Sequence, residues 1–160
     1  MLECKFKGCN AGEPLLDENI FNIMDLRTGI ITAFDRYLQY LGFHDANKKE
    51  IYEGDVLELV ITDDMLDIHK NGFAGSNIGK CIKELGDVTS VILVMRDDAK
   101  FMSTPYSMYF CRNEKMERDE DGNPDEVTSG SDFSFPQYLC NKGAKIVGNI
   151  IANPNLLDKR

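Results

Sequence analysis

The chain lacks the short motifs by which most enzyme families are recognised from sequence. Its 160 residues contain no nucleophile elbow, no phosphate-binding loop and no dinucleotide-binding glycine pattern. Carboxylates are plentiful, and His44 and His69 are the two histidines, so a carboxylate-dependent hydrolase whose groups meet only in the fold stays open. The sequence favours a protein without catalytic activity.

Long apolar runs are also missing. The strongest run, at residues 91–95, is far shorter than the roughly 20 residues that a membrane-spanning helix needs. Residues 1–5 lack the basic and then apolar order of a signal peptide. With 42% hydrophobic and 28% charged residues, the composition is that of a soluble globular protein. We expect a cytoplasmic location and no membrane partner.

Paired cysteines are absent as well. The five cysteines, at positions 4, 9, 81, 111 and 140, form no C-x-x-C pair and leave one over, which is typical of free thiols in a reducing compartment. A metal site of Cys4, Cys9 and one histidine is a weaker alternative, because structural zinc sites usually pair their ligands at short spacing. We expect no metal and no cofactor.

Clusters of basic residues are the fourth absence. Lysine and arginine never form a run longer than two residues, and the net charge is −9. Because phosphate contacts need clustered positive charge, this pattern weighs against direct binding of nucleic acid. An acidic surface instead suits a basic protein partner, or an inhibitor that imitates nucleic acid.

What the chain does contain is a dense turn-and-strand pattern at residues 39–56. Asp45 can accept hydrogen bonds from backbone amides two residues on, and Asn47 tolerates a left-handed backbone. Residues 45–48 are therefore predicted to form a tight turn.

A strand is predicted to begin near Glu50, because the residues that follow are rich in β-branched and aromatic side chains. Gly54 interrupts it and is followed directly by Asp55. A glycine inside a strand pattern indicates a bulge or a sharp bend, as at the rim of a barrel.

The same stretch resembles the YopX family of phage and prophage proteins, whose pattern is similar to Q-Y-T-G-L-x-D-x-N-G-K-E-I-Y-E-G-D-I/V. A second match lies at residues 147–157, which are similar to V-I-G-N-I-Y-E-N-P-E-L-L, and residues 5–8 are similar to the family's K-F-R-G opening. The positions that match the first pattern are Gln39, Tyr40, Gly42, Asp45, Asn47, Lys49, Glu50, Ile51, Tyr52, Glu53, Gly54, Asp55 and Val56.

The resemblance implies a mainly β protein (β-rich α+β) with a small SH3-like barrel, flanking short helices and an inserted helical and loop region. It also implies self-association as a homo-oligomer and an origin in a phage or an integrated element, hence a bacterial host cell. No activity and no catalytic residue come with it.

We expect one domain over residues 1–160, with an insertion at about 62–87 and an acidic loop at about 113–130. Lys48 departs from the family pattern, which has glycine there, and this favours a longer or bulged turn. The middle of the chain looks expanded relative to the family.

Within this frame several elements are predicted. Residues 19–35 favour a hairpin slightly over a helix at 16–26, whose apolar residues also fit a helical period. Residues 63–70 could form one or two helical turns. Residues 76–86 favour a short helix capped by Ser76 and stopped by Gly86. Strands are predicted at residues 88–95 and 106–111.

The acidic loop is the nearest approach to a metal-binding motif. Residues 114–126 hold seven acids and two bases, and the segment is better interpreted as the mobile tip of a hairpin than as a calcium loop, because the twelfth position lacks a glutamate. With Gly122 at the sixth position, the calcium ligands would be Glu117, Asp119, Asp121, Asp125 and Thr128.

The family-like stretch at 39–56 has two interpretations. Its side chains could form an interaction surface, since small barrels often bind through aromatic and acidic residues in rim loops. The alternative, which we favour, is that each has a local structural role in the turn, bend or core. His44 is more easily assigned to the surface than to catalysis. The candidate surface residues are Tyr40, Asp45, Tyr52, Glu53 and Asp55.

The sequence therefore favours a non-enzymatic binding or assembly module, an accessory protein of a mobile element. An acidic inhibitor that imitates nucleic acid is the first alternative, and the carboxylate-dependent hydrolase is the second.

Overall fold

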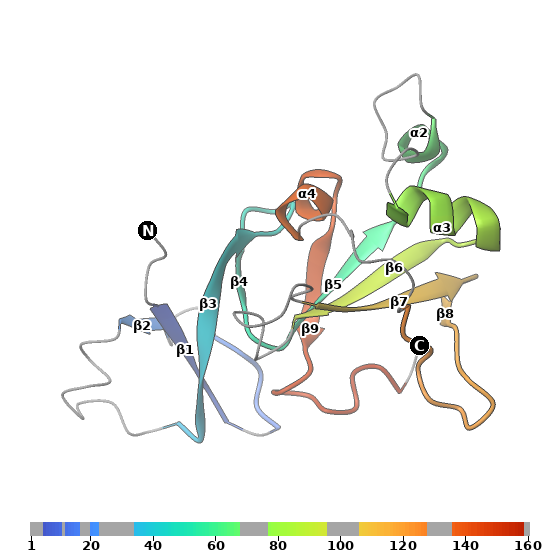
Figure 1. The fold of residues 1–160 in the computed structure, drawn as a ribbon. Helices are drawn as coiled ribbons and strands as arrows, with labels where there is room; N and C mark the ends of the chain where they lie inside the picture. Colours follow the sequence, from blue (N-terminus) through green and yellow to red (C-terminus); the bar gives the residue numbers. More distant parts are fainter. Residues whose placement is uncertain are drawn as a thin grey trace.

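Two antiparallel sheets form the molecule in a computed structural model, which describes residues 5–10, 12–16, 20–22, 34–67, 77–95, 106–127 and 136–158. In Figure 1 the four-stranded sheet, of strand order β2-β1-β3-β4, lies on the left, and the five-stranded sheet, β8-β7-β6-β5-β9, lies on the right. The strands are β1 (Lys5–Cys9), β2 (Ile20–Asn22), β3 (Arg36–His44), β4 (Glu50–Tyr52), β5 (Asp55–Val60), β6 (Ser90–Met95), β7 (Tyr106–Arg112), β8 (Lys115–Met116) and β9 (Lys145–Asn149).

The protein is mainly β, as predicted, and the five-stranded sheet curls as half of a barrel. The closer likeness to an SH3 barrel stays a prediction. Among the described residues, no helix is long and apolar enough to cross a membrane.

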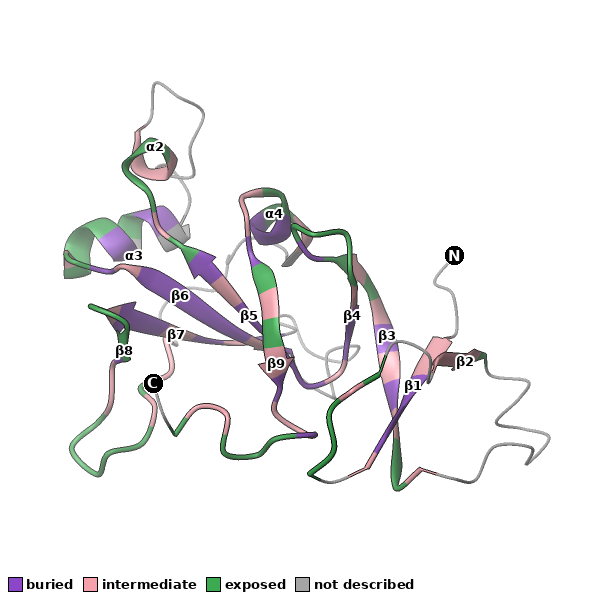
Figure 2. Ribbon diagram, turned by 180° about the vertical axis from the view of Figure 1, so that it is seen from behind, coloured by how far each residue is buried: buried purple, intermediate pink, exposed green. Residues whose placement is uncertain are grey.

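The five-stranded sheet carries most of the apolar core. β6 is its central strand, pairing with β5 on one side and β7 on the other. Its β-branched run is buried at every position except Val94, which confirms the strand predicted at residues 88–95. The strand predicted at 106–111 is confirmed as β7. Burial is shown by residue in Figure 2, where purple dominates β5, β6 and β7.

The four-stranded sheet has two packed faces. Leu38 and Tyr40 of β3 lie in one cluster with Tyr52, while Leu41 and Phe43 pack against the large core on the other side. Gly42 of β3 has a φ of +86°, and the β3–β4 register shifts between Tyr40 and His44. Successive side chains of a strand point to opposite faces, so β3 contributes to both clusters, and the register shift marks a bulge within it.

Residues 52–55 carry the chain from one sheet to the other. Gly54 has a φ of +79°, its amide donates to Met95 O, and its carbonyl accepts from Ile150 N. The predicted bend at Gly54 is confirmed.

Short helices flank the sheets: α2 (Asp63–Leu66), α3 (Asn77–Leu85) and α4 (Pro136–Asn141). α2 and α3 lie between β5 and β6, where the insertion is predicted. Gly86 directly follows α3 and stops it, as predicted: it has a φ of +61° and donates its amide to Ile82 O. The expected cap Ser76 and residues 68–70 lie outside the described residues. The sequence pattern does not indicate α4, whose Leu139 and Cys140 enter the large core.

The choice between a hairpin at residues 19–35 and a helix at residues 16–26 is resolved in part. Residues 20–22 form β2, which pairs with β1, so a helix does not run through them. The rest of the predicted hairpin, residues 23–33, lies outside the described residues.

The acidic loop is paired with the sheet rather than separate from it. A bridge between Arg118 and Pro124 confirms the hairpin, and a second bridge joins Glu126 to Tyr109 of β7. Arg118 also donates from Nη1 to Gly122 O (3.0 Å) and from Nη2 to Leu157 O (2.7 Å). The loop is therefore tied to β7 and to the C-terminal segment, which the sequence does not predict.

Candidate functional site

A cleft of about 840 Å³ lies where the two sheets meet. One wall of the cleft comes from β1 and residues 12–15, and a second comes from β4. A third wall comes from β9 and residues 152–156. β4 and β9 are the strands at the ends of the two sheets, and Figures 1 and 2 both show β9 running between β5 and β4. We call this junction of β4 and β9 the seam.

The first tie across the seam is Asp45, which is 4% exposed. Its Oδ1 accepts hydrogen bonds from Asn47 N (2.8 Å) and Lys49 N (2.9 Å), which closes the predicted turn. Its Oδ2 accepts from Ile146 N of β9 at 3.0 Å. The left-handed residue of the turn is Lys48, with a φ of +64°, and not Asn47 as expected. One carboxylate thus closes a local turn and joins it to the other sheet.

The second tie is Asp55, which accepts from Tyr52 N at Oδ2 (2.7 Å) and from Asn149 Nδ2 at Oδ1 (2.9 Å). Asn149 also donates to Glu53 O, and its Oδ1 accepts from the amides of residues 151 and 152. A β-carbon on Gly54 would lie 2.6 Å from Ile151 Cδ1 and 3.0 Å from Asn149 Oδ1. The close approach here therefore requires glycine.

Burial raises the pKa of Asp55 from its ordinary value of 3.8 to about 6. The hydrogen bonds from Tyr52 and Asn149 and the charge of Lys7 act in the opposite direction, and the negative charge of Asp45 adds to the rise. Burial is the largest of these effects, as expected for a carboxyl group only 4% exposed.

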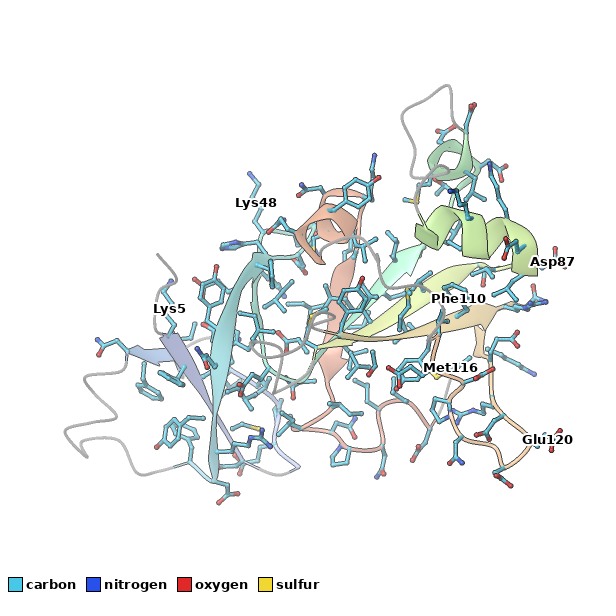
Figure 3. The ribbon with its side chains drawn as sticks, viewed as in Figure 1. Lys5, Lys48, Asp87, Phe110, Met116 and Glu120 are labelled. Atoms are coloured by element: carbon cyan, nitrogen blue, oxygen red, sulfur yellow. The ribbon has the colours of Figure 1, made fainter. Side chains whose placement is uncertain are left out.

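A cation lies beside this carboxylate on the inner face of β1. Lys7 is 8% exposed, and its Nζ lies 4.5 Å from the centroid of the Tyr52 ring. Tyr52 donates its hydroxyl to Glu50 Oε2 at 2.8 Å, and Glu50 Oε1 accepts from Lys5 Nζ at 2.5 Å. Figure 3 shows Lys5 projecting from β1 near β3, whereas Lys48 projects from the end of the β3–β4 turn.

These contacts also shift the pKa values of Tyr52 and Glu50, which line the cleft. Burial, and then the hydrogen bond and charge of Glu50, raise the pKa of Tyr52. Burial opposes a low pKa for Glu50, but the hydrogen bonds from Lys5 and Tyr52 outweigh it and the pKa is lowered. The tyrosine is thus held as a neutral donor and the glutamate as an anion.

Four of the five residues predicted as an interaction surface are buried: Tyr40, Asp45, Tyr52 and Asp55. Glu53 is half-buried, and its Oε2 accepts from Gln39 N at 3.2 Å. Tyr52 and Asp55 line the cleft. These positions account for the turn, the bend and the sheet junction, while their role in recognition stays a prediction.

Sequence reasoning does not single out Lys7, Glu50 or Asn149 as site residues. A signal for them existed, because each falls in one of the three stretches that carry the family resemblance: residues 5–8, 39–56 and 147–157. All three stretches contribute to the walls of the cleft.

The other candidate groups lie elsewhere. His44 is exposed and is not in the cleft wall, and its Nδ1 lies 3.5 Å from Tyr40 Oη. In the part of the chain that the structure describes, no three His, Cys, Asp or Glu side chains gather as metal ligands. Cys9, Cys111 and Cys140 are free thiols, whereas Cys4 and His69 lie outside the described residues.

The fold and the site together define a small, mainly β protein in which two sheets meet at a polar seam beside a cleft. A family model described as YopX protein matches residues 15–158, so the chain belongs to the YopX family. No curated protein and no solved structure matches the chain.

Proposed function

We propose that this protein is a non-enzymatic binding module of a phage or prophage and that the cleft beside the seam is its binding site. The observation that supports it is the convergence of three stretches, far apart in sequence, on one cleft. The same stretches carry the likeness to the family pattern, and Lys7, Glu50 and Asn149 lie in them.

The physical form of the cleft agrees with this role. Its volume, about 840 Å³, is within the range of roughly 300–1,000 Å³ typical of ligand sites. Apolar wall residues such as Leu15, Ile20 and Leu156 surround a few buried polar groups that hydrogen bonds hold in place. Fixed groups of this kind reduce the entropy lost on binding.

A cleft-blocking variant tests the proposal. Asn153 is exposed at the cleft wall, so Asn153→Trp should reduce the open volume without removing a core contact. Glu120→Trp is the control, since Glu120 lies at the tip of the acidic loop, away from the sheets (Figure 3). The chain contains no tryptophan, so each variant also carries a single fluorophore.

The wild type and both variants should be used as bait in bacterial lysate, with bound proteins and small molecules identified by mass spectrometry. A partner or ligand held by the wild type and by Glu120→Trp, but lost from Asn153→Trp, would support the cleft as the site. Equal retention by all three would place the function elsewhere. Light scattering of the eluate would test the expected homo-oligomer.

The acidic inhibitor is a second candidate, because the acidic loop is held on the sheet while its carboxylates face solvent. Asp119, Glu120, Asp121 and Asp125 are exposed, and such a surface suits a basic partner. Displacement of the bound partner by DNA, together with loss of binding on neutralising these four residues, would select this function.

The hydrolase has weaker support. Glu50 and Asp55 both line the cleft and have pKa values shifted in opposite directions, as paired acids and bases often do. Both oxygens of Asp55 nevertheless accept hydrogen bonds from the seam. Its geometry suits a structural carboxylate better than one that moves a proton.

A further inference from the structure

We infer that the cleft takes a short peptide with both ends free, whose carboxylate lies at Lys49 and whose ammonium group lies at Glu13. The inference rests on the proposed function and names the ligand class of that same site.

The cleft is elongated, and contacts at its two ends fix the direction of its long axis. At one end the amides of Lys49 and Ile146 donate to the same carboxylate. At the other end Gly12 N donates to Ala152 O at 3.2 Å, and all four residues line the cleft. The part of β9 from Ile146 to Asn149 alone spans about 10 Å, which is the length of about four residues of an extended peptide.

The two ends carry exposed charges of opposite sign. Lys49 lies at the first end, and its side chain has no partner among the described residues. Glu13 follows Gly12 at the second end, where its Oε2 accepts from Asn10 Nδ2 at 3.0 Å and its Oε1 is open to a further donor. A cation and an anion placed this far apart complement the two ends of a zwitterionic chain.

The buried polar groups between these ends are already engaged within the protein. Both oxygens of Asp55 accept hydrogen bonds, and Asn149 uses both amide hydrogens and its oxygen. The hydroxyl of Tyr52 donates to Glu50, and Lys7 has its own contacts in the protein, including the Tyr52 ring. Recognition of charge on a ligand therefore falls to the two ends of the cleft.

The remainder of the wall is apolar. Leu15, Ile20 and Leu156 present apolar surface to the cleft. The Leu156 side chain packs over Gly148, where a β-carbon would lie 2.7 Å from Leu156 Cδ2. Apolar surface between two opposite charges suits a peptide with apolar side chains.

An internal segment of a partner protein, added as a strand, fits the seam less well. Strand addition needs free main-chain groups along an edge. Here the amides of Lys49 and Ile146 already donate to Asp45, and that of Tyr52 donates to Asp55. An internal segment also lacks the two terminal charges that the ends of the cleft complement.

The test uses the tetrapeptide Leu-Ala-Val-Leu with both ends free, with an acetylated amino end, with an amidated carboxyl end, and with both ends blocked. Binding to the full chain would be measured by isothermal titration calorimetry. Lys49→Gln and Glu13→Gln each remove one charge at an exposed position. Lys145→Gln and Glu120→Gln are the matched controls, because both positions are exposed and lie outside the cleft wall.

Each end of the peptide should be coupled to one residue only. Amidation should weaken binding to the wild type by about two- to fivefold, as expected for loss of an exposed ion pair, and should have no further effect in Lys49→Gln. Acetylation should weaken binding to a similar extent and should have no further effect in Glu13→Gln. Both control variants should behave as the wild type does.

Equal affinity of the wild type for the free and the doubly blocked peptide would overturn the inference, and this comparison needs no variant. That result would point to an internal segment of a protein as the ligand. Raising the salt concentration should weaken binding of the free peptide and leave the doubly blocked peptide unaffected, because only the former depends on exposed charges.

Failure of this inference can be separated from failure of the proposed function. If the free peptide does not bind, but Asn153→Trp still loses its lysate partner, the cleft is the site and a free peptide is the wrong ligand. If both experiments fail, the cleft is not the binding site.

Discussion

The seam and the acidic loop use the same local chemistry in opposite surroundings. Asp45 Oδ1 accepts from the amides two and four residues on, and so does Asp119 Oδ1 in the acidic loop. Gly54 and Gly122 have nearly the same φ, +79° and +82°. Asp45 and Gly54 are buried between the sheets, whereas Asp119 and Gly122 are exposed.

This comparison shows that turn chemistry alone does not define a role. In the acidic loop the aspartate and glycine shape a hairpin in solvent. In the seam the same pair also joins two sheets, because the second oxygen of Asp45 reaches β9 and the glycine gives room to Ile151 and Asn149. The four predictions below test that difference, in order of decreasing effect.

Replacement of the two glycines by alanine should separate backbone strain from close contact. Gly122→Ala should cost only the left-handed strain, about 1 kcal/mol, because nothing lies within 4 Å of the added β-carbon. Gly54→Ala should cost about 4 kcal/mol, since the methyl group also collides with Ile151 and Asn149. Urea unfolding of both variants is the measurement, and equal losses would contradict the close-packed seam.

Asn149→Leu tests whether hydrogen bonds or packing hold the seam. Leucine has a similar size but loses the bonds to Asp55, Glu53 and the amides beyond, so we expect a loss of about 3 kcal/mol. Asn155→Leu, at an exposed position of the same segment, should change the stability by less than about 0.5 kcal/mol. A small effect at Asn149 would mean that apolar contact is sufficient there.

The seam should make stability depend on pH through Asp55. Its pKa is about 6 in the folded protein and ordinarily 3.8, so between these values the folded state binds more protons than the unfolded state. The free energy of unfolding should therefore fall, by up to about 3 kcal/mol, as the pH rises from about 4 to about 6.

Unfolding curves over this range should show the fall in the wild type and not in Asp55→Asn. Glu50, whose pKa is lowered, loses its contribution as the pH falls, but it is present in both proteins and cancels in their difference. Parallel curves would contradict the shifted pKa of Asp55.

The smallest effect is expected from the two aspartates. Asp45→Asn can keep the local turn through its remaining oxygen, but its amide would face Ile146 N, so about 1 kcal/mol should be lost. Asp119→Asn keeps the same two local bonds and should be nearly neutral. Thermal melting of both variants would test this, and equal shifts would show that the tie to β9 contributes nothing.

Local features of the fold follow from the sequence. The turn at Asp45, the bend at Gly54, the helix that ends at Gly86 and the buried run of β6 all depend on residues close together in the chain. Each has a local backbone or periodicity reason, which is what a sequence pattern reports.

The candidate site cannot be predicted from the sequence in the same way. Asp45 meets Ile146, and Asp55 meets Asn149, across 101 and 94 positions, and no spacing rule indicates such partners. Lys7 shows the same limit, because its position in β1 is visible but its stacking on Tyr52 is not. The bridge between Glu126 and Tyr109, which pairs the acidic loop with β7, likewise depends on tertiary contact.

The separation between the partners of the seam has a consequence for synthesis on the ribosome. Asp45 and Asp55 are synthesised 101 and 94 residues before their respective partners in β9, Ile146 and Asn149. Contacts between distant segments form late in folding, so the nascent chain holds these two carboxylates without the C-terminal strand that satisfies them. The seam can therefore close only after β9, which follows the core strands β5, β6 and β7 in the sequence, has been synthesised.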